Sequence, residues 1–310
     1  MYTRGVFCYN TIVDMRGIKS CGLMALAIGA LAWTLYASER PDTLFRDVQV
    51  GTGAAVHVSW AKGTGRASTS LPLLPDGHTA VSPAWCITSD GSLVVVWEET
   101  SRDGADADIT AQKVRPDGKT AWSAAGVAVN AFRGRQQHPR VSPTDDGGVY
   151  VVWQSDSAGR DNVNIWCQRL RADGSWAWTD TPTPVCTFPK NQVNPDIATD
   201  LDGAALIVWV DYRNGNADIY GQRLERDATP FAAEDGIAIE VAPGDQTNVR
   251  FEYDRKGNAT SVAWDETRAG FPQPVKVKTD ISRLPIPEPG SLAVAAIAAF
   301  LMRRLRVPRA

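Results

Sequence analysis

The chain has 310 residues, a formal net charge of −3 and 44% apolar residues. This composition is typical of a globular protein with a sizeable core, and it lacks the strongly basic balance of nucleic-acid-binding proteins. We therefore expect no nucleic acid among the partners.

Residues 1–37 have the features of a signal peptide. Two basic residues precede a short apolar stretch from Gly22 to Ala37, and a polar segment follows it. This order of parts is that of a secretory signal, so the sequence predicts export with cleavage near Ala37. An uncleaved membrane anchor is the alternative, and Met15 competes with Met1 as the start of the chain.

Residues 38–80 form an irregular segment that resembles a degenerate first repeat. The run VHVSW (56–60) is a short apolar strand, and Pro75-Asp76-Gly77 has the composition of a turn. A terminal repeat of atypical sequence is expected in a stacked array, because its outer face has no neighbour.

Residues 81–280 contain a repeat that is marked by the tryptophans ending four apolar runs. Trp97, Trp153, Trp209 and Trp264 recur at a nearly constant interval of about 56 residues, the kind of period that indicates a repeat architecture. Each unit reads as strand, turn, apolar strand, polar loop, strand, turn, strand. About four strands in a repeat of ~50–56 residues predict an all-β fold, either a β-propeller or a propeller-like array.

The second and third strands of each unit differ in pattern. Nearly continuous apolar runs predict second strands that are buried on both faces: LVVVW (93–97), VYVVW (149–153) and ALIVWV (205–210). The third strands alternate more and end in basic residues, so we expect them nearer a sheet edge: ADITAQKV (107–114), VNIWCQRL (163–170) and ADIYGQRL (217–224).

Acidic residues and arginines recur after each apolar strand, where the loops of a propeller would gather at one rim. The residues are Glu98, Glu99 and Arg102; Asp156 and Arg160; Asp211 and Arg213; and Asp265, Glu266 and Arg268. Glycosidases need paired carboxylates, but a group present in every repeat is better explained by Asp–Arg pairs that hold each loop. The sequence favours a non-enzymatic role in binding polysaccharide or protein, with a propeller glycoside hydrolase or lyase as the alternative.

Five cysteines are present, and removal of residues 1–37 leaves Cys86, Cys167 and Cys186. Cys167 and Cys186 fall in the third and fourth strands of one unit, so a disulfide between them is plausible in an oxidising compartment. Buried free thiols are the equal alternative.

Cofactors are not expected, and no cysteine or histidine spacing of a metal site is present. Calcium is an option at the acidic stretches 103–108 and 200–203, although solvated turns are the favoured interpretation. Trp176 and Trp178 are expected to pack an outer strand, with sugar stacking as the alternative.

Residues 281–310 form a tail in three parts: Pro287-Glu288-Pro289, an apolar run from Leu292 to Met302, and a basic cluster of Arg303, Arg304, Arg306 and Arg309. The order of these parts resembles the PEP-CTERM sorting signal of Gram-negative bacteria. This resemblance implies recognition by an exosortase in the inner membrane, cleavage near the Pro-Glu-Pro motif, and delivery to the cell surface or the extracellular matrix.

The apolar run of the tail has roughly 12 residues, against the ~20 that a transmembrane helix needs. The arginines that follow would hold the end of such a helix on the cytoplasmic side of the membrane. A buried or amphipathic C-terminal helix is the alternative.

Overall fold

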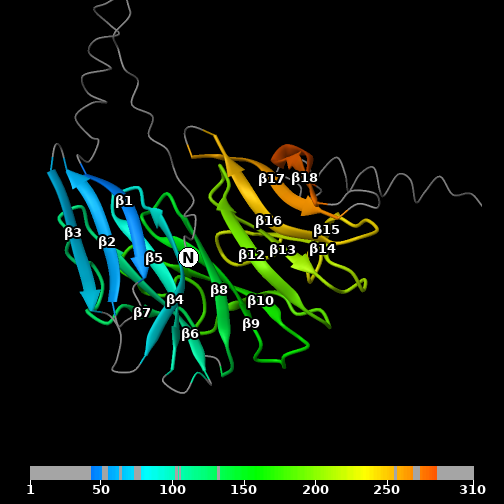
Figure 1. Ribbon diagram of the computed structural model, residues 1–310, viewed down its shortest axis with the longest axis horizontal. Coiled ribbons are helices and arrows are strands. Elements are labelled where there is room, and N and C mark those ends of the chain that lie inside the picture. Colours follow the sequence, from blue (N-terminus) through cyan, green and yellow to red (C-terminus); the bar gives the residue numbers. More distant parts are fainter. Residues whose placement is uncertain are drawn as a thin grey trace, which may run out of the picture.

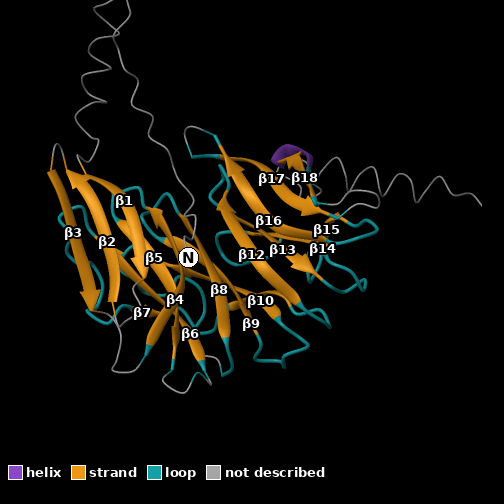
Figure 2. Ribbon diagram, in the orientation of Figure 1, coloured by secondary structure: helices purple, strands orange, loops and turns teal. Residues whose placement is uncertain are grey.

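The computed structural model describes residues 43–50, 55–62, 65–72, 78–101, 104, 106–130, 133–254, 257–267 and 273–284. In these ranges the chain forms strands β1 to β18 and a short 3₁₀ helix, η1 (Ile281–Arg283) (Figure 1, Figure 2). The described ranges contain no helix long and apolar enough to cross a membrane. The predicted signal helix and the predicted tail helix lie outside the described residues.

The strands form five antiparallel sheets, which we call blades 1 to 5. Blade 1 contains β1 (Thr43–Val50), β2 (Ala55–Lys62) and β3 (Gly65–Pro72), and blade 2 contains β4 (Thr79–Ile87), β5 (Leu93–Thr100), β6 (Ala107–Val114) and β7 (Val127–Ala128). Blade 3 contains β8 (Gln136–Pro143), β9 (Val149–Ser155), β10 (Asn164–Leu170) and β11 (Thr183–Cys186). Blade 4 contains β12 (Gln192–Thr199), β13 (Ala205–Asp211), β14 (Asp218–Leu224) and β15 (Ile237–Glu240), and blade 5 contains β16 (Gln246–Tyr253), β17 (Ala259–Glu266) and β18 (Val275–Asp280).

The blades fan out around their first strands, which lie next to one another in the order β4, β8, β12 and β16. Figure 1 shows blade 1 and blade 5 at the two ends of this arc. Successive blades are antiparallel meanders, since each strand pairs with the next one along the chain. The predicted all-β array of four-stranded repeats is confirmed in blades 2, 3 and 4.

The second strand of each full blade is buried along its apolar run. The tryptophans that mark the repeat are all buried, with exposed fractions of 0% for Trp97, Trp153 and Trp209 and 2% for Trp264. This burial confirms the prediction from the continuous apolar runs. Each second strand is covered on both faces because it is sandwiched between neighbouring blades.

The third strands are more buried than their sequences predict. All residues of β14 are buried, as are most residues of β6 and β10. They lie next to the outer edge strand of each sheet, as expected, and the predicted fourth strands are the short strands β7, β11 and β15, which pair with their outer sides. The alternating pattern did not reveal how fully the third strands are buried.

The basic residue near the end of each third strand forms an ion pair with the turn between the first two strands of its blade. The N···O distances are 2.9 Å for Lys113–Asp90, 2.6 Å for Arg169–Asp146 and 2.7 Å for Arg223–Asp200. Three blades therefore share one internal tie, made at equivalent positions of successive repeats.

The turns between third and fourth strands have the same backbone conformation in three blades. Gly118, Gly174 and Ala228 have φ values of +84°, +87° and +73°. Glycine reaches this left-handed region without strain, whereas alanine does so at a cost of about 1–2 kcal/mol. The third copy of the turn is therefore strained.

We expect Ala228→Gly to raise the free energy of unfolding by about 0.5–1 kcal/mol, since it removes this strain against the larger unfolded-state entropy of glycine. Gly174→Ala should lower the same free energy by about 2–4 kcal/mol, because the new Cβ would also lie 2.9 Å from the Trp122 ring. Denaturant titration of both variants measures these changes. If the two substitutions changed the free energy of unfolding in the same direction and by the same amount, the assignment of backbone strain to Ala228 would be contradicted.

Candidate functional site

Each blade has two ends, or rims. At the first rim the innermost strand begins and the second strand ends, as the pairing of Gln136 with Ser155 and of Gln192 with Asp211 shows. The loops that carry the repeated acidic and arginine residues follow the second strands, so they start at this rim. The turns that contain Gly174 and Ala228 lie at the opposite, second rim.

Each innermost strand of blades 2 to 5 has a β-bulge near its beginning. The bulges contain Ser82, His138, Asn194 and Asn248, whose φ values are +52°, +54°, +53° and +54°. Serine, histidine and asparagine tolerate this conformation better than most residues with a side chain. Bulges and strained residues of this kind concentrate at functional sites, which directs attention to the innermost strands.

Two of the bulge amides are bound by the preceding blade. Glu98 Oε1 accepts the backbone N–H of His138 at 2.8 Å, and Gln154 Oε1 accepts that of Asn194 at 2.8 Å. Glu98 and Gln154 directly follow the tryptophans that mark the repeat. The predicted loop acid Glu98 therefore joins one blade to the next, and its role here is structural.

This joint generates a prediction with a natural control. Glu98→Ala would leave a buried N–H without an acceptor, so it should lower the free energy of unfolding by about 1–3 kcal/mol. Glu98→Gln retains an acceptor of the kind that blade 3 uses in Gln154, so it should stay within about 0.5 kcal/mol of the native protein. Denaturant titration measures both. If Glu98→Gln lowers the free energy of unfolding as much as Glu98→Ala does, the charge of Glu98 stabilises the protein rather than its hydrogen bond to His138.

Asp196 lies two residues beyond the bulge residue Asn194 of β12 and is only 6% exposed. Its Oδ2 accepts the backbone N–H of Phe251 on β16 at 2.8 Å. Burial raises the pKa of the Asp196 carboxyl, and the nearby charges of Arg140 and Arg250 act against this rise. A buried acid whose ionisation is favoured by the charges of two arginines thus lies on the innermost strands.

Arg140 on β8 and Arg250 on β16 occupy the positions that correspond to Asp196 in their blades. Arg140 Nη1 donates to Pro139 O at 2.9 Å, and Arg250 Nη1 donates to Asn248 O at 3.0 Å. The Arg250 side chain is 39% exposed and lies 4.0 Å from Asp265, too far for a hydrogen bond.

His138 and the two bulge asparagines complete this group. Burial and the charge of Arg140 lower the pKa of the half-buried His138, while Glu98 opposes the change. Asn194 and Asn248 are exposed, and Asn248 Nδ2 donates to Asp265 at 2.9 Å. We call the following set the central face: His138, Arg140, Asn194, Asp196, Asn248 and Arg250.

The central face was not among the residues singled out from the sequence. Its available signal was the repeated step from a polar residue to proline, seen at matching positions of successive repeats in Ser82-Pro83, His138-Pro139 and Asn194-Pro195. In the fourth repeat, Val249 stands in place of this proline. A polar residue followed by proline does not by itself predict a bulge.

The predicted Asp–Arg pairs form in one loop and not in another. Asp211 and Arg213 make an ion pair of 2.7 Å, and Asp211 also accepts a hydrogen bond from Trp209 Nε1 at 2.9 Å. Asp156 instead accepts the backbone N–H of Arg135 at 2.6 Å. A pair in every loop is therefore wrong as a general rule. Arg102 and Arg268 lie outside the described residues.

The other acids of this prediction have separate partners. Glu99 lies 3.0 Å from His78 Nδ1 and accepts a hydrogen bond from Thr110 Oγ1 at 2.9 Å. Glu266 ends β17 opposite Gln246. These acids belong to individual blades and do not extend the central face.

The proposed disulfide between Cys167 and Cys186 is absent, since both residues are free buried thiols. A register shift in the β10–β11 pair places Cys186 opposite Ile165 and Cys167 opposite Thr183. Arg213 Nη2 lies 3.2 Å from Cys186 Sγ. Burial raises the pKa of Cys186 to about 12, which makes it an inert thiol near neutral pH.

Trp176 and Trp178 pack between blades, as the favoured interpretation predicted. Trp176 Nε1 donates to Ala128 O of blade 2 at 2.9 Å, and Trp178 Nε1 donates to Arg226 O of blade 4 at 2.8 Å. Trp122 Nε1 donates to Ala172 O of blade 3 at 3.0 Å. These rings therefore contribute to the outer packing between the blades.

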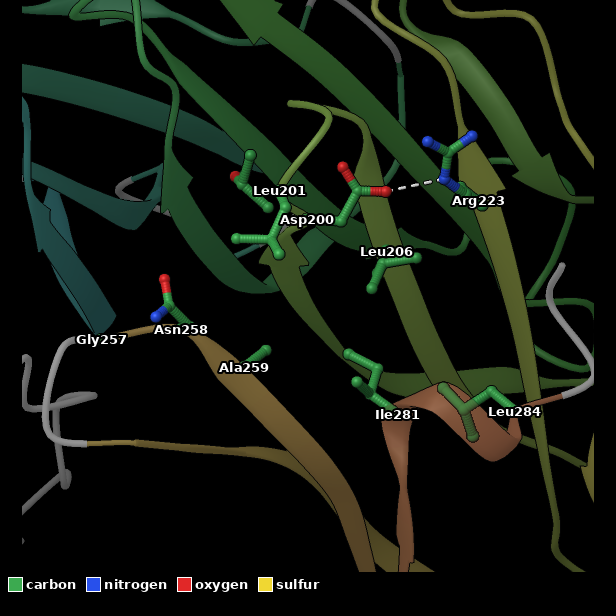
Figure 3. Close-up of a pocket in the computed structure, with 10 residues that line it drawn as sticks. Asp200, Leu201, Leu206, Arg223, Gly257, Asn258, Ala259, Ile281 and Leu284 are labelled. Carbon is green, nitrogen blue, oxygen red and sulfur yellow. Dashed lines mark hydrogen bonds and ion pairs between the residues drawn. The ribbon is translucent and has the colours of Figure 1, made fainter. Parts of the chain in front are cut away.

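A cavity of about 150 Å³ lies at the second rim between blades 4 and 5. Figure 3 shows Leu206, Ile281 and Leu284 around it, with the Asp200–Arg223 ion pair at its edge. Asp200 Oδ1 accepts the backbone N–H groups of the next turn, and its Oδ2 is bound by Arg223. Its carboxylate serves the turn, in agreement with the favoured interpretation of this acidic stretch. The cavity is smaller than typical ligand pockets of ≈ 300–1,000 Å³.

No group of three or more potential metal-ligating side chains lies together in the described part of the chain. Asp103 and Ala105, in the other acidic stretch considered for calcium, lie outside the described ranges, as do Ala37, Pro287, Glu288 and Pro289.

The fold and its radial blades define a propeller-like all-β protein. No family model matches the chain, and no curated protein matches it. Among solved structures it is similar to a protein of unknown function from Dyadobacter fermentans, with a TM-score of 0.51, 15% identity, and coverage of 76% of this chain and 67% of that one.

Two further similar structures are those of a glycoside hydrolase and an endo-arabinase. A thermostable family-43 glycoside hydrolase has a TM-score of 0.45 and 11% identity over 80% of this chain and 96% of that one. An endo-arabinase from Bacteroides thetaiotaomicron has a TM-score of 0.47 and 12% identity over 77% and 93% of the two chains. At these identities the likeness concerns the fold alone.

Proposed function

We propose that the protein binds a glycan at the central face, as a non-enzymatic surface or matrix protein. The observation that carries this proposal is the row of bulges, which presents polar side chains from three neighbouring innermost strands at one place. Backbone strain of this kind persists only where the surrounding structure supports it, and it is frequent at ligand sites.

The chemistry of the central face suits a polyhydroxylated ligand. Each sugar hydroxyl both donates and accepts hydrogen bonds, so a glycan site needs both kinds of group close together. The guanidiniums of Arg140 and Arg250 supply donors, and the amides of Asn194 and Asn248 supply both donors and acceptors. His138 adds an imidazole that burial keeps in its neutral form at a lower pH than usual.

Glycan hydrolysis is a second candidate, and one residue favours it. Asp196 is the acid that occupies its repeat position in one blade alone, and its pKa is raised by burial. A glycosidase needs one carboxyl that stays protonated to donate to the leaving group. The glycoside hydrolase and the endo-arabinase named above share the propeller-like fold, but this likeness supplies no residue of a mechanism.

A binding assay with paired variants tests the glycan proposal. The double variant Asn194→Gly, Asn248→Gly removes both amides, and glycine accepts the positive φ at each position without strain. We expect at least a tenfold loss of affinity for a bound oligosaccharide on a glycan array. Ala228→Gly, at the opposite rim, is the matched control and should bind like the native protein.

The same experiment separates binding from hydrolysis. Incubation of the native protein with each bound oligosaccharide should release no new reducing ends if the role is binding. Release that disappears in Asp196→Asn, with binding retained, would establish the hydrolase instead. An array on which the native protein binds no glycan would refute both candidates.

We also propose that the protein is exported and sorted to the cell envelope of a Gram-negative bacterium. This proposal rests on the signal-like segment 1–37 and on the tripartite tail with Pro287, Glu288 and Pro289. An exosortase would act on the tail in the inner membrane, so contact with that membrane would be transient. A surface location agrees with an extracellular polysaccharide as ligand.

Intact mass spectrometry of the envelope fraction tests this route, in cells with and without a functional exosortase. We expect a mature chain that lacks residues 1–37 in both strains and lacks the tail after the Pro-Glu-Pro motif only when exosortase is present. A chain that still ends at Ala310 in both strains would refute sorting and leave a simple anchor or helix.

A further inference from the structure

The central face contains an unusual order of charges across three adjacent strands. The corresponding positions on β8, β12 and β16 are occupied by Arg140, Asp196 and Arg250. The same position in blade 2 is Ala84, so the order is not a feature of every repeat. A charge pattern confined to part of the array is a better candidate for ligand recognition than the ties that recur in each blade.

The two guanidiniums are incompletely neutralised. The buried acid on the strand between them, Asp196, already accepts the Phe251 N–H through its Oδ2 at 2.8 Å, and burial raises its pKa. Asp265 is the acid next to Arg250, but at 4.0 Å it makes a weak, partly solvated pair. Asp196 carries at most one negative charge, so the two guanidiniums outnumber it.

Most donors of these arginines remain available to a ligand. Each guanidinium has five N–H donors. The hydrogen bonds of their side chains within the described ranges are those of Arg140 Nη1 to Pro139 O and of Arg250 Nη1 to Asn248 O. Both go to carbonyls of the local bulge, which orients each guanidinium and leaves its other nitrogens able to bind an anion.

Asp196 is held too firmly to move aside when a ligand binds. Its side chain is buried between the innermost strands, and the bond to Phe251 joins blade 4 to blade 5. It is therefore a fixed acid on the strand between those of Arg140 and Arg250, and the two arginines are oriented by their own bulge carbonyls.

We propose that the central face binds the carboxylate of an acidic sugar, such as a uronate, through the guanidiniums of Arg140 and Arg250. This inference rests on the proposed glycan binding and specifies the class of glycan. Arginine forms bidentate hydrogen bonds with carboxylates, and these charge-assisted bonds are stronger than those to a neutral hydroxyl. A neutral glycan of the same length would receive only the weaker hydrogen bonds from these guanidiniums to its hydroxyls.

The test compares matched acidic and neutral ligands. Oligomers of galacturonate, glucuronate and mannuronate are titrated into the purified full-length chain by calorimetry, each beside its carboxyl-reduced counterpart. We expect at least one acidic oligomer to bind tenfold or more tightly than its reduced form. Its affinity should fall as salt rises, because the contact is between exposed charges.

Variants assign the preference to the two arginines. Arg140→Ala and Arg250→Ala should each lower affinity for the acidic oligomer at least tenfold and lower affinity for the reduced form several-fold less, because only the charge-assisted part of the contact is specific to the carboxylate. Arg140→Lys keeps the positive charge but cannot form the bidentate hydrogen bonds of a guanidinium, so its affinity for the acidic oligomer should lie between those of Arg140→Ala and the native protein. Lys119→Ala, which removes an exposed cation from a turn at the second rim, is the control and should bind normally.

Asp196→Asn provides an independent measurement, because asparagine can still accept the Phe251 N–H and carries no charge at any pH. We expect it to bind the acidic oligomer at least as tightly as the native protein does. Equal affinity for the acidic and reduced forms would overturn this inference and leave glycan binding intact. If the reduced and acidic oligomers and every other glycan fail to bind, the proposed function itself is refuted.

Discussion

The structure depends on the burial of the second strand of each blade on both faces. An apolar run that ends in tryptophan cannot be covered by its own sheet, so blades 2 to 4 have a neighbouring blade on each side, and blade 5, at the end of the arc, packs against blade 4. Burying a large aromatic side chain is worth several kcal/mol on the basis of the area removed from water. The packing between blades therefore explains why tryptophan recurs regularly in the sequence, at Trp97, Trp153, Trp209 and Trp264.

Polar joints then set how neighbouring blades meet. Glu98 and Gln154 reach from the end of one apolar run to the bulge amide of the next blade, while Asp196 reaches from β12 to Phe251. Buried N–H groups need acceptors, so these joints are structural whatever else the residues do. The outer tryptophans add a second set of joints through their indole N–H groups.

The same bulges that satisfy these joints also present the central face. A bulge changes the direction of the strand and re-aims the side chains that follow it. Glu98 and Gln154 have the same role in their blades. The positions after the bulges, in contrast, differ from blade to blade, as Arg140 and Asp196 illustrate. In a repeat protein, common residues maintain the fold and divergent residues at a shared position are free to specify a ligand.

The sequence alone determined the repeat, the all-β class and the burial of the second strands, because these follow from local patterns of apolar residues and turns. It also indicated a turn between the third and fourth strands of each unit, and the structure places Gly118 and Gly174 there with positive φ. Tertiary structure decided the rest. Burial of the third strands depends on pairing with the outer strands and on packing between blades. The free thiols of Cys167 and Cys186 depend on a register shift, and the grouping of Arg140, Asp196 and Arg250 depends on contacts between successive blades. Contacts between segments so distant along the chain leave no periodicity in a single sequence, so only the packed structure reveals them.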